Sequence, residues 1–97
     1  MHARIITVPT KPDVMDDVRN LYESSVIPVM EKQAGFKGFK LMGNEDTNIG
    51  ISMTFWETEA DMLAGEASGY LQEVLGGLAQ FFAGQPSNAH YEVSLEG

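Results

Sequence analysis

The feature that most constrains the fold is that large apolar residues stand side by side within short, strand-like segments. Three segments rich in β-branched or aromatic residues are predicted to be strands: residues 3–8, 36–42 and 49–56. Successive side chains of a strand point to opposite faces, so pairs such as Ile5–Ile6 and Phe55–Trp56 place apolar groups on both faces of a sheet. Each face of that sheet therefore needs a cover of its own.

A long helix is predicted between the first two strands. From residue 13 to residue 33, apolar positions recur with the period of about 3.6 residues that is typical of an amphipathic helix. Pro28 lies inside this pattern and cannot donate a hydrogen bond to the carbonyl of Ser24. We therefore expect a kink or a break after Ile27.

A second helical region follows the third strand. Thr58 begins a sequence of capping-box form, which predicts a short helix over residues 58–67. Another helix is predicted over residues 68–82. Gly76 and Gly77 should bend it, because each glycine costs a helix about 1 kcal/mol relative to alanine.

The order of these elements predicts the fold class. Residues 89–95 alternate in polarity and predict a fourth strand. Strand, helix, two strands, helices and strand is the ferredoxin-like βαββαβ order of an α+β fold with a four-stranded antiparallel sheet. The chain is expected to form one domain over residues 1–97. Because the helices suffice for one sheet face, the other is predicted to pack against a second copy, as a homodimer.

Charge is distributed unevenly along this acidic chain. All six Lys and Arg residues lie in the first forty positions with five acids, whereas the last 57 residues carry nine acids and no base. The net charge is −8. Without a basic stripe the chain is not suited to neutralise nucleic acid phosphates, and an anionic membrane surface would repel it. We expect neither nucleic acid nor membrane as a partner.

The residue types that are absent limit the chemistry further. The chain has no cysteine, which excludes disulfides, thiolate catalysis, zinc fingers and iron–sulfur clusters. Its two histidines show no metal-ligand spacing and no glycine-rich phosphate loop is present, so neither a metal nor a cofactor is expected. No apolar run approaches the roughly 18 residues of a membrane span and no leader pattern is visible, so we expect a cytoplasmic location.

Three motifs of the chain, read in order, carry a family resemblance. They are VIPVM at residues 26–30, GFKG at residues 35–38 and FWETEADM at residues 55–62. In this arrangement the chain resembles the antibiotic biosynthesis monooxygenase domain over nearly its whole length. The resemblance implies a dimeric α/β barrel. That group includes cofactor-free oxygenases that act on quinols, haem-degrading enzymes, isomerases and proteins without an established reaction.

The resemblance to the quinol-oxidising members implies particular pocket residues. The Trp that closes the third strand lines their substrate pocket, and Trp56 matches it, although it could instead pack as core. The Asn four residues before that Trp is Ser52 here. The Tyr and the Arg that follow it are replaced by Met62 and Gly76.

The resemblance to the haem-degrading members is weaker. Their site is formed by a first-strand Asn, a helical Trp and a helical His. Ile6 and Thr7 occupy the matching strand region, which makes Thr7 a candidate for ligand contact. Because the chain has no histidine between residues 3 and 89, the axial ligand is missing and haem is disfavoured.

Several other residues are candidates by their own chemistry. Tyr22 and Tyr70 lie on the predicted helices, where a phenol can hydrogen-bond a quinol or an enolate, or else border the core. His90 and His2 are the natural bases near neutral pH, but their positions favour the surface or an interface. The cations that matter if the ligand is anionic are Arg4, Lys37 and Lys40.

Together these patterns predict a mostly apolar pocket between sheet and helices that holds a small apolar or aromatic molecule. As an enzyme, the protein is expected to be a cofactor-independent monooxygenase of a small aromatic or quinol-like substrate. The deprotonated substrate would give an electron to dioxygen while the protein orients it and hydrogen-bonds its anion. The alternative is a non-catalytic small-ligand-binding or accessory protein. An isomerase or lyase would need His90 or a carboxylate inside the pocket.

Overall fold

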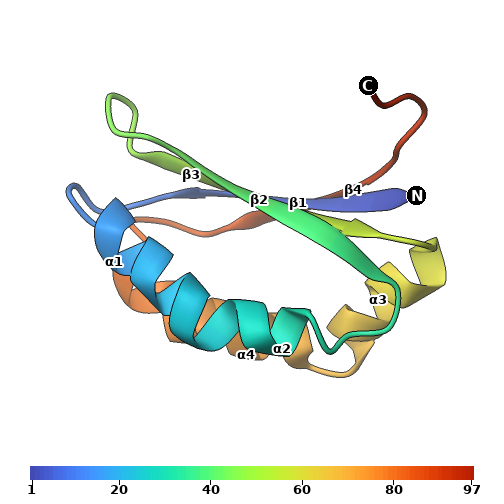
Figure 1. Cartoon of the computed structure of the whole chain (residues 1–97). Coiled ribbons are helices and arrows are strands. Elements are labelled where there is room, and N and C mark those ends of the chain that lie inside the picture. The colour runs from blue at the N-terminus through green and yellow to red at the C-terminus, as the bar shows by residue number, and fades with distance from the viewer.

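The computed structural model describes all residues from Met1 to Gly97 and consists of two layers, a sheet and a set of helices (Figure 1). The strands are β1 (His2–Pro9), β2 (Phe36–Asn44), β3 (Ile49–Trp56) and β4 (Ser87–Glu92). They pair antiparallel in the order β2-β3-β1-β4. This is an α+β ferredoxin-like fold, as the sequence predicts.

The helices all lie against one face of this sheet, and the opposite face has no helix over it (Figure 1). The helical segments are α1 (Met15–Leu21), η1 (Tyr22–Val26), α2 (Ile27–Met30), α3 (Glu59–Ala67), α4 (Tyr70–Leu78) and η2 (Ala79–Phe81). None of the helices is both long enough and apolar enough to pass through a membrane.

The first helix departs from the prediction in its length and in the place of its irregularity. It begins at Met15, because Asp13 has a φ of 61° and cannot be part of it. The backbone N–H of Ile27 donates to the carbonyl of Tyr22, five residues back, so η1 is a π-helical turn that precedes Pro28. The chain thus stays helical past the proline, so the helix does not break after Ile27, and its irregularity lies before Pro28.

The last elements also differ in detail from the prediction. α4 remains helical through Gly76 and Gly77, and the helix tightens only at η2. β4 ends at Glu92 rather than at residue 95, since its partner β1 runs out there: His2 pairs with Glu92, and Val93 bonds only to the carbonyl of Met1.

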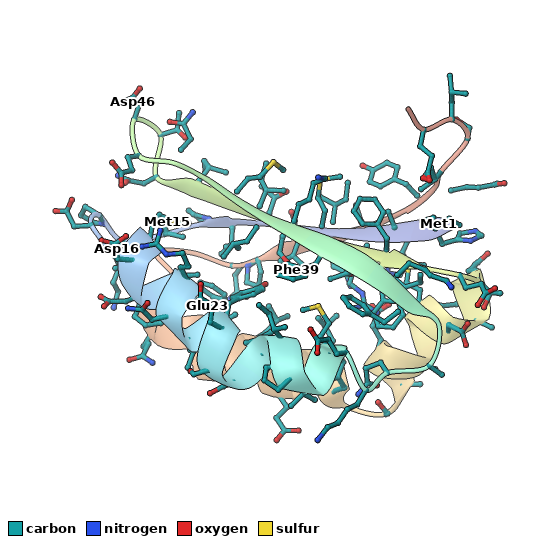
Figure 2. All side chains as sticks on the ribbon, viewed as in Figure 1. Met1, Met15, Asp16, Glu23, Phe39 and Asp46 are labelled. Carbon is teal, nitrogen blue, oxygen red and sulfur yellow. The ribbon has the colours of Figure 1, made fainter.

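The two faces of the sheet are both apolar. Ile6, Val8 and Trp56 are buried on the face that the helices cover. On the other face, Ile5 stands directly opposite Met53. We call this second surface the open face and define it by four residues that are half-buried or exposed: Ile5, Met42, Met53 and Phe55. Figure 2 shows that side chains also stand on the side of the sheet away from the helices.

Gly35 lies in the turn between α2 and β2, in a backbone conformation that only glycine adopts readily. Its φ is 77°, and a Cβ added there would collide with the side chain of Asp61 on α3. The carbonyl of Gly35 accepts a hydrogen bond of 2.8 Å from the backbone of Glu57. This turn therefore holds the start of α3 beside the end of the first helix.

Candidate functional site

A cavity of about 60 Å³ lies between the sheet and the helices. Its walls are mostly apolar. The polar side chains that line it are Arg4, Thr10, Tyr22, Ser52, Thr54 and Tyr70. None of the lining residues is an Asp, Glu or His, so Arg4 is the only charged group in the cavity.

The cavity is small as it stands. Met15, Tyr22 and Leu41 line both this cavity and an open groove between α1 and β2. These side chains separate the cavity from solvent, and an aromatic ligand would displace the flexible Met15 when it enters.

Tyr22 and Ser52 form one polar side of the cavity. Tyr22 points from η1 toward β3, where its hydroxyl donates to Ser52 Oγ at 2.8 Å. Ser52 faces the helices because it belongs to the even-numbered set of β3 residues, whose other members include the buried Thr54 and Trp56. The Ser52 hydroxyl proton remains available for a ligand.

Tyr70 and Arg4 form the other polar side. Both lie against α3 at Gly65: a methyl group placed on Gly65 would be 3.4 Å from the Tyr70 ring and 3.5 Å from Arg4 Nη2. The Tyr70 hydroxyl makes no hydrogen bond within the chain. Tyr70 and Arg4 therefore line the same part of the cavity, where the Tyr70 hydroxyl is free to donate to a ligand.

Burial changes the acidity of these groups. Burial raises the pKa of Tyr70 to about 12, an effect that Tyr22 reinforces and the charge of Arg4 opposes. Burial also raises the pKa of Tyr22, against the opposing effect of its bond to Ser52. Both phenols therefore keep their protons at neutral pH and act as hydrogen-bond donors. Burial lowers the pKa of Arg4, while Glu66 and Tyr70 act in the opposite direction.

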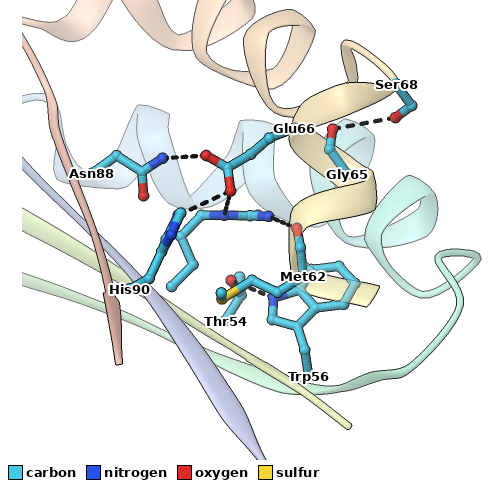
Figure 3. A network of polar contacts seen from close by, with 9 residues as sticks. Thr54, Trp56, Met62, Gly65, Glu66, Ser68, Asn88 and His90 are labelled. Atoms are coloured by element: carbon cyan, nitrogen blue, oxygen red, sulfur yellow. Dashed lines mark hydrogen bonds and ion pairs between the residues drawn. The ribbon is translucent and has the colours of Figure 1, made fainter. Parts of the chain in front are cut away.

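A network of polar contacts behind the cavity fixes Arg4 (Figure 3). Its Nη2 donates to the carbonyl of Met62, and its Nε lies 3.7 Å from Glu66 Oε2. The same carboxylate oxygen lies 2.9 Å from His90 Nε2, and Glu66 Oε1 accepts from Asn88 Nδ2 at 2.6 Å. Glu66, on α3, thus shares its charge among three partners, Arg4 from β1 and Asn88 and His90 from β4.

Trp56 lies beneath this network rather than in the cavity wall. It is fully buried, and its indole N–H donates to Thr54 Oγ1 at 3.0 Å. The guanidinium of Arg4 lies 5.4 Å from its ring centre, and the ring of Phe36 meets it edge-on at 5.6 Å. Trp56 therefore packs against the guanidinium of Arg4 and hydrogen-bonds the hydroxyl of Thr54.

No group of three or more His, Asp or Glu side chains comes together as a metal site would require. Glu66 and His90 form only a pair, and the amide of Asn88 is their third neighbour. The cavity itself offers one cation and hydroxyl groups, which suit an anion or an oxygen-rich organic ligand and not a metal ion.

The sequence matches the antibiotic biosynthesis monooxygenase family over residues 1–76. The chain belongs to this family. No curated protein sequence matches it significantly. The resemblance inferred from the three sequence motifs is thereby confirmed.

Solved structures agree with membership of the antibiotic biosynthesis monooxygenase family. A protein from Bordetella bronchiseptica named after this family has a TM-score of 0.78 at 20% identity, with 97% of each chain covered. A mutant of MhuD with two manganese protoporphyrin IX molecules bound per active site has a TM-score of 0.77 at 21% identity, covering 100% of this chain and 98% of that one. A monooxygenase from Streptomyces coelicolor in complex with nanaomycin D has a TM-score of 0.70 at 19% identity, covering 99% and 92%. The TM-scores show that this chain shares the fold of these proteins.

The structure brings together only part of the residue set that the sequence suggests for this family member. Ser52, Tyr22 and Tyr70 line one cavity. Trp56 lies outside the lining, behind Thr54. His90 contacts Glu66 at the edge of the sheet. Thr7 pairs with Ile51 and Ser87, which places it among the odd-numbered residues of β1 that point away from the helices.

The roles of Arg4 and Glu66 were not predicted from the sequence. Arg4 was a candidate only as one of three cations that could contact an anionic ligand, and Glu66 was not a candidate. One signal was available: Arg4 has the same parity as Ile6 and Val8, so it faces the helices with them and must be buried. A buried cation then requires a partner, but only the structure identifies it as Glu66.

The acidity of Tyr70 gives a direct spectroscopic prediction. In an alkaline titration followed by tyrosinate absorbance, one component should ionise near pH 12 and disappear in Tyr70→Phe. Since the folded pKa is raised from 10.0 to about 12, the associated stability is complete below pH 10 and is lost as the pH rises toward 12. If Tyr70→Phe instead removes a component that ionises near pH 10, this residue does not lie in the buried position described.

Proposed function

We propose that the cavity is the active site of a cofactor-independent monooxygenase that acts on a small aromatic substrate of quinol or anthrone type. The observation that carries this proposal is the composition of the cavity: apolar walls, with Arg4, Ser52 and Tyr70 as donors toward one ligand. Membership of the antibiotic biosynthesis monooxygenase family supports it. So does the monooxygenase from Streptomyces coelicolor, whose structure holds nanaomycin D.

The reaction proposed for an anthrone needs no bound redox group. The substrate carbanion gives an electron to dioxygen, and the resulting radical and superoxide combine to a carbon-bound peroxide. After protonation the peroxide loses water and leaves a ketone. One oxygen atom of dioxygen thus becomes the new carbonyl oxygen and the other becomes water, while the substrate methylene loses both of its hydrogens.

The chain's own residues would lower the barrier by holding the substrate anion in place. Arg4, Tyr70 and Ser52 would hydrogen-bond its oxygen atoms, and such fixed donors are worth more in a site that excludes water. Apolar walls that include Val18 and Leu78 would hold the ring flat against the sheet and keep solvent from the radical pair.

A porphyrin does not fit this site. No His, the common axial ligand of haem, lines the cavity. His90 is engaged with Glu66 at the sheet edge. The porphyrin-binding property of MhuD is therefore not carried over to this chain.

The direct test is oxygen consumption with a panel of anthrones and hydroquinones. We expect uptake above the spontaneous rate for at least one of them. Tyr70→Phe should reduce the uptake by about 10- to 100-fold, because one oriented donor is lost. Tyr91→Phe, at an exposed position on β4, is the matched control and should leave uptake unchanged. If no compound of the panel is oxidised faster than in buffer, the enzymatic proposal fails.

A second candidate is a non-catalytic protein that binds the same class of small ligand. The observation that favours it is the absence of a carboxylate or imidazole in the cavity wall, since a catalyst that starts from a neutral substrate needs a base. This candidate predicts saturable binding of quinone-like molecules. Tyr70→Phe should weaken this binding, and no oxygen uptake should be observed.

We further propose that two copies pack through their open faces. This face carries Ile5, Met53 and Phe55 in the middle of the sheet, and leaving them in water would cost a chain of 97 residues much of its apolar burial. The opposite face is already covered by helices (Figure 1). A homodimer with a twofold axis would cover both open faces at once.

A further inference from the structure

We infer that the cavity selects ligands that are already anionic when they bind, such as hydroxyquinones, enolised β-diketones or acidic phenols, and that Arg4 determines this selection. The inference rests on the proposed function and narrows its substrate class. The ligand would release its proton to solvent water before it enters, so that no residue of the cavity has to accept it.

The first argument is the charge of the cavity wall. Among its lining residues Arg4 is the only one with a charge, although the chain as a whole carries a net charge of −8. The side chain of Arg4 is 2% exposed, so it is screened little by solvent. A buried guanidinium in a wall without any other charge attracts an anion more strongly than the dipole of a neutral ligand.

The second argument is the lack of a base. General-base catalysis needs an acceptor within hydrogen-bond reach of the proton, and the wall offers no carboxylate and no imidazole. Tyr22 and Tyr70 are held in their neutral form by burial, so neither phenol serves as a base that takes up a proton. A ligand that still carried its acidic proton would find hydroxyl oxygens to hydrogen-bond it but no group basic enough to remove it.

The positive charge of Arg4 is only partly compensated within the chain. Glu66 is its only carboxylate partner, and the Nε–Oε2 distance of 3.7 Å is too long for a hydrogen bond. The carboxylate also serves His90 at 2.9 Å and Asn88 at 2.6 Å. Arg4 Nε finds no hydrogen-bond partner in the chain and Nη1 is not used by any backbone carbonyl. Glu66 thus positions Arg4 without neutralising it fully.

The test compares two ligands of nearly the same shape and different charge. Lawsone, a hydroxynaphthoquinone, is an anion at neutral pH, and its methyl ether is neutral. Affinities are measured by equilibrium dialysis, with quenching of Trp56, the only tryptophan, as a second signal. We expect lawsone to bind about 10- to 100-fold more tightly, the range that corresponds to one charge-assisted hydrogen bond.

Three variants assign this preference to Arg4. Arg4→Met should abolish it, and Arg4→Lys should keep most of it because the charge remains. Glu66→Gln should move the affinity in the opposite direction and strengthen lawsone binding several-fold, since the competing negative charge is removed. Lys32→Met, at an exposed site on the helical side, is the matched control for loss of a positive charge and should change nothing.

The outcomes separate this inference from the proposed function. Equal affinity for the two ligands, failure of lawsone to bind, or weaker binding in Glu66→Gln would overturn it, even if oxygen uptake with anthrones is observed. Preference for lawsone without oxygen uptake from any substrate would support the inference and refute the monooxygenase. Because Glu66→Gln predicts a gain, the test does not depend on whether Arg4→Met folds.

Discussion

Replacing Trp56 with alanine is expected to lower the free energy of unfolding by about 3–5 kcal/mol, the usual cost of removing a fully buried aromatic side chain. Trp56 is 0% exposed and lies between Phe36 and the guanidinium of Arg4. The truncation would leave a void below Arg4 and release the hydroxyl of Thr54. A loss of this size is a large part of the total stability of a small domain, roughly 5–15 kcal/mol.

Urea unfolding followed by circular dichroism measures this loss. Leu63→Ala, in α3, serves as the control. Leu63 is 40% exposed, so its truncation should lower the free energy of unfolding by about 1 kcal/mol or less. Trp56→Phe should retain most of the stability and most of the ligand affinity, since Trp56 does not line the cavity. A loss below about 1 kcal/mol in Trp56→Ala would show that this side chain is not buried as described.

Met53→Glu is expected to convert the proposed homodimer to a monomer. Met53 lies in the central part of the open face, opposite Ile5 of β1 and Lys40 of β2. A twofold interface would contain the substituted carboxylate twice, and removing each carboxylate from water costs several kcal/mol even beside Lys40. The dimer dissociation constant should therefore rise by about 1000-fold or more.

Sedimentation velocity at micromolar concentration distinguishes the two states. Gln72→Glu, on the exposed side of α4, adds the same charge to the helical layer and should leave the dimer intact. A Met53→Glu variant that remains a dimer, or a wild-type chain that sediments as a monomer, would contradict packing through the open face.

The parity of strand residues carried most of what could be predicted. Ile6 and Trp56 lie under the helices and Ile5 and Phe55 on the open face, as their neighbouring positions require. Strand alternation also put Ser52 on the same face as Trp56, and the structure shows that this face lies under the helices with Tyr22. The element order followed from the same short-range patterns, and the structure has that order.

Depth and long-range pairing were not predictable in this way. Alternation assigns Trp56 to the helical face, but it does not tell whether Arg4 or the cavity lies above its ring. The contact of Glu66 with His90 joins residues of α3 and β4 that are neighbours only because α3 crosses near the sheet edge. The π-helical turn at Tyr22 was missed because the apolar spacing of an α-helix does not reveal one extra residue.

A crystal structure of the protein with bound lawsone tests the central claim most directly. We expect the ring to lie between sheet and helices, Met15 to have moved aside, and the ligand's charged oxygen to lie within hydrogen-bond distance of Arg4 and Tyr70. Density for the ligand on the open face or in the outer groove, with the cavity still closed around Tyr22, would contradict it.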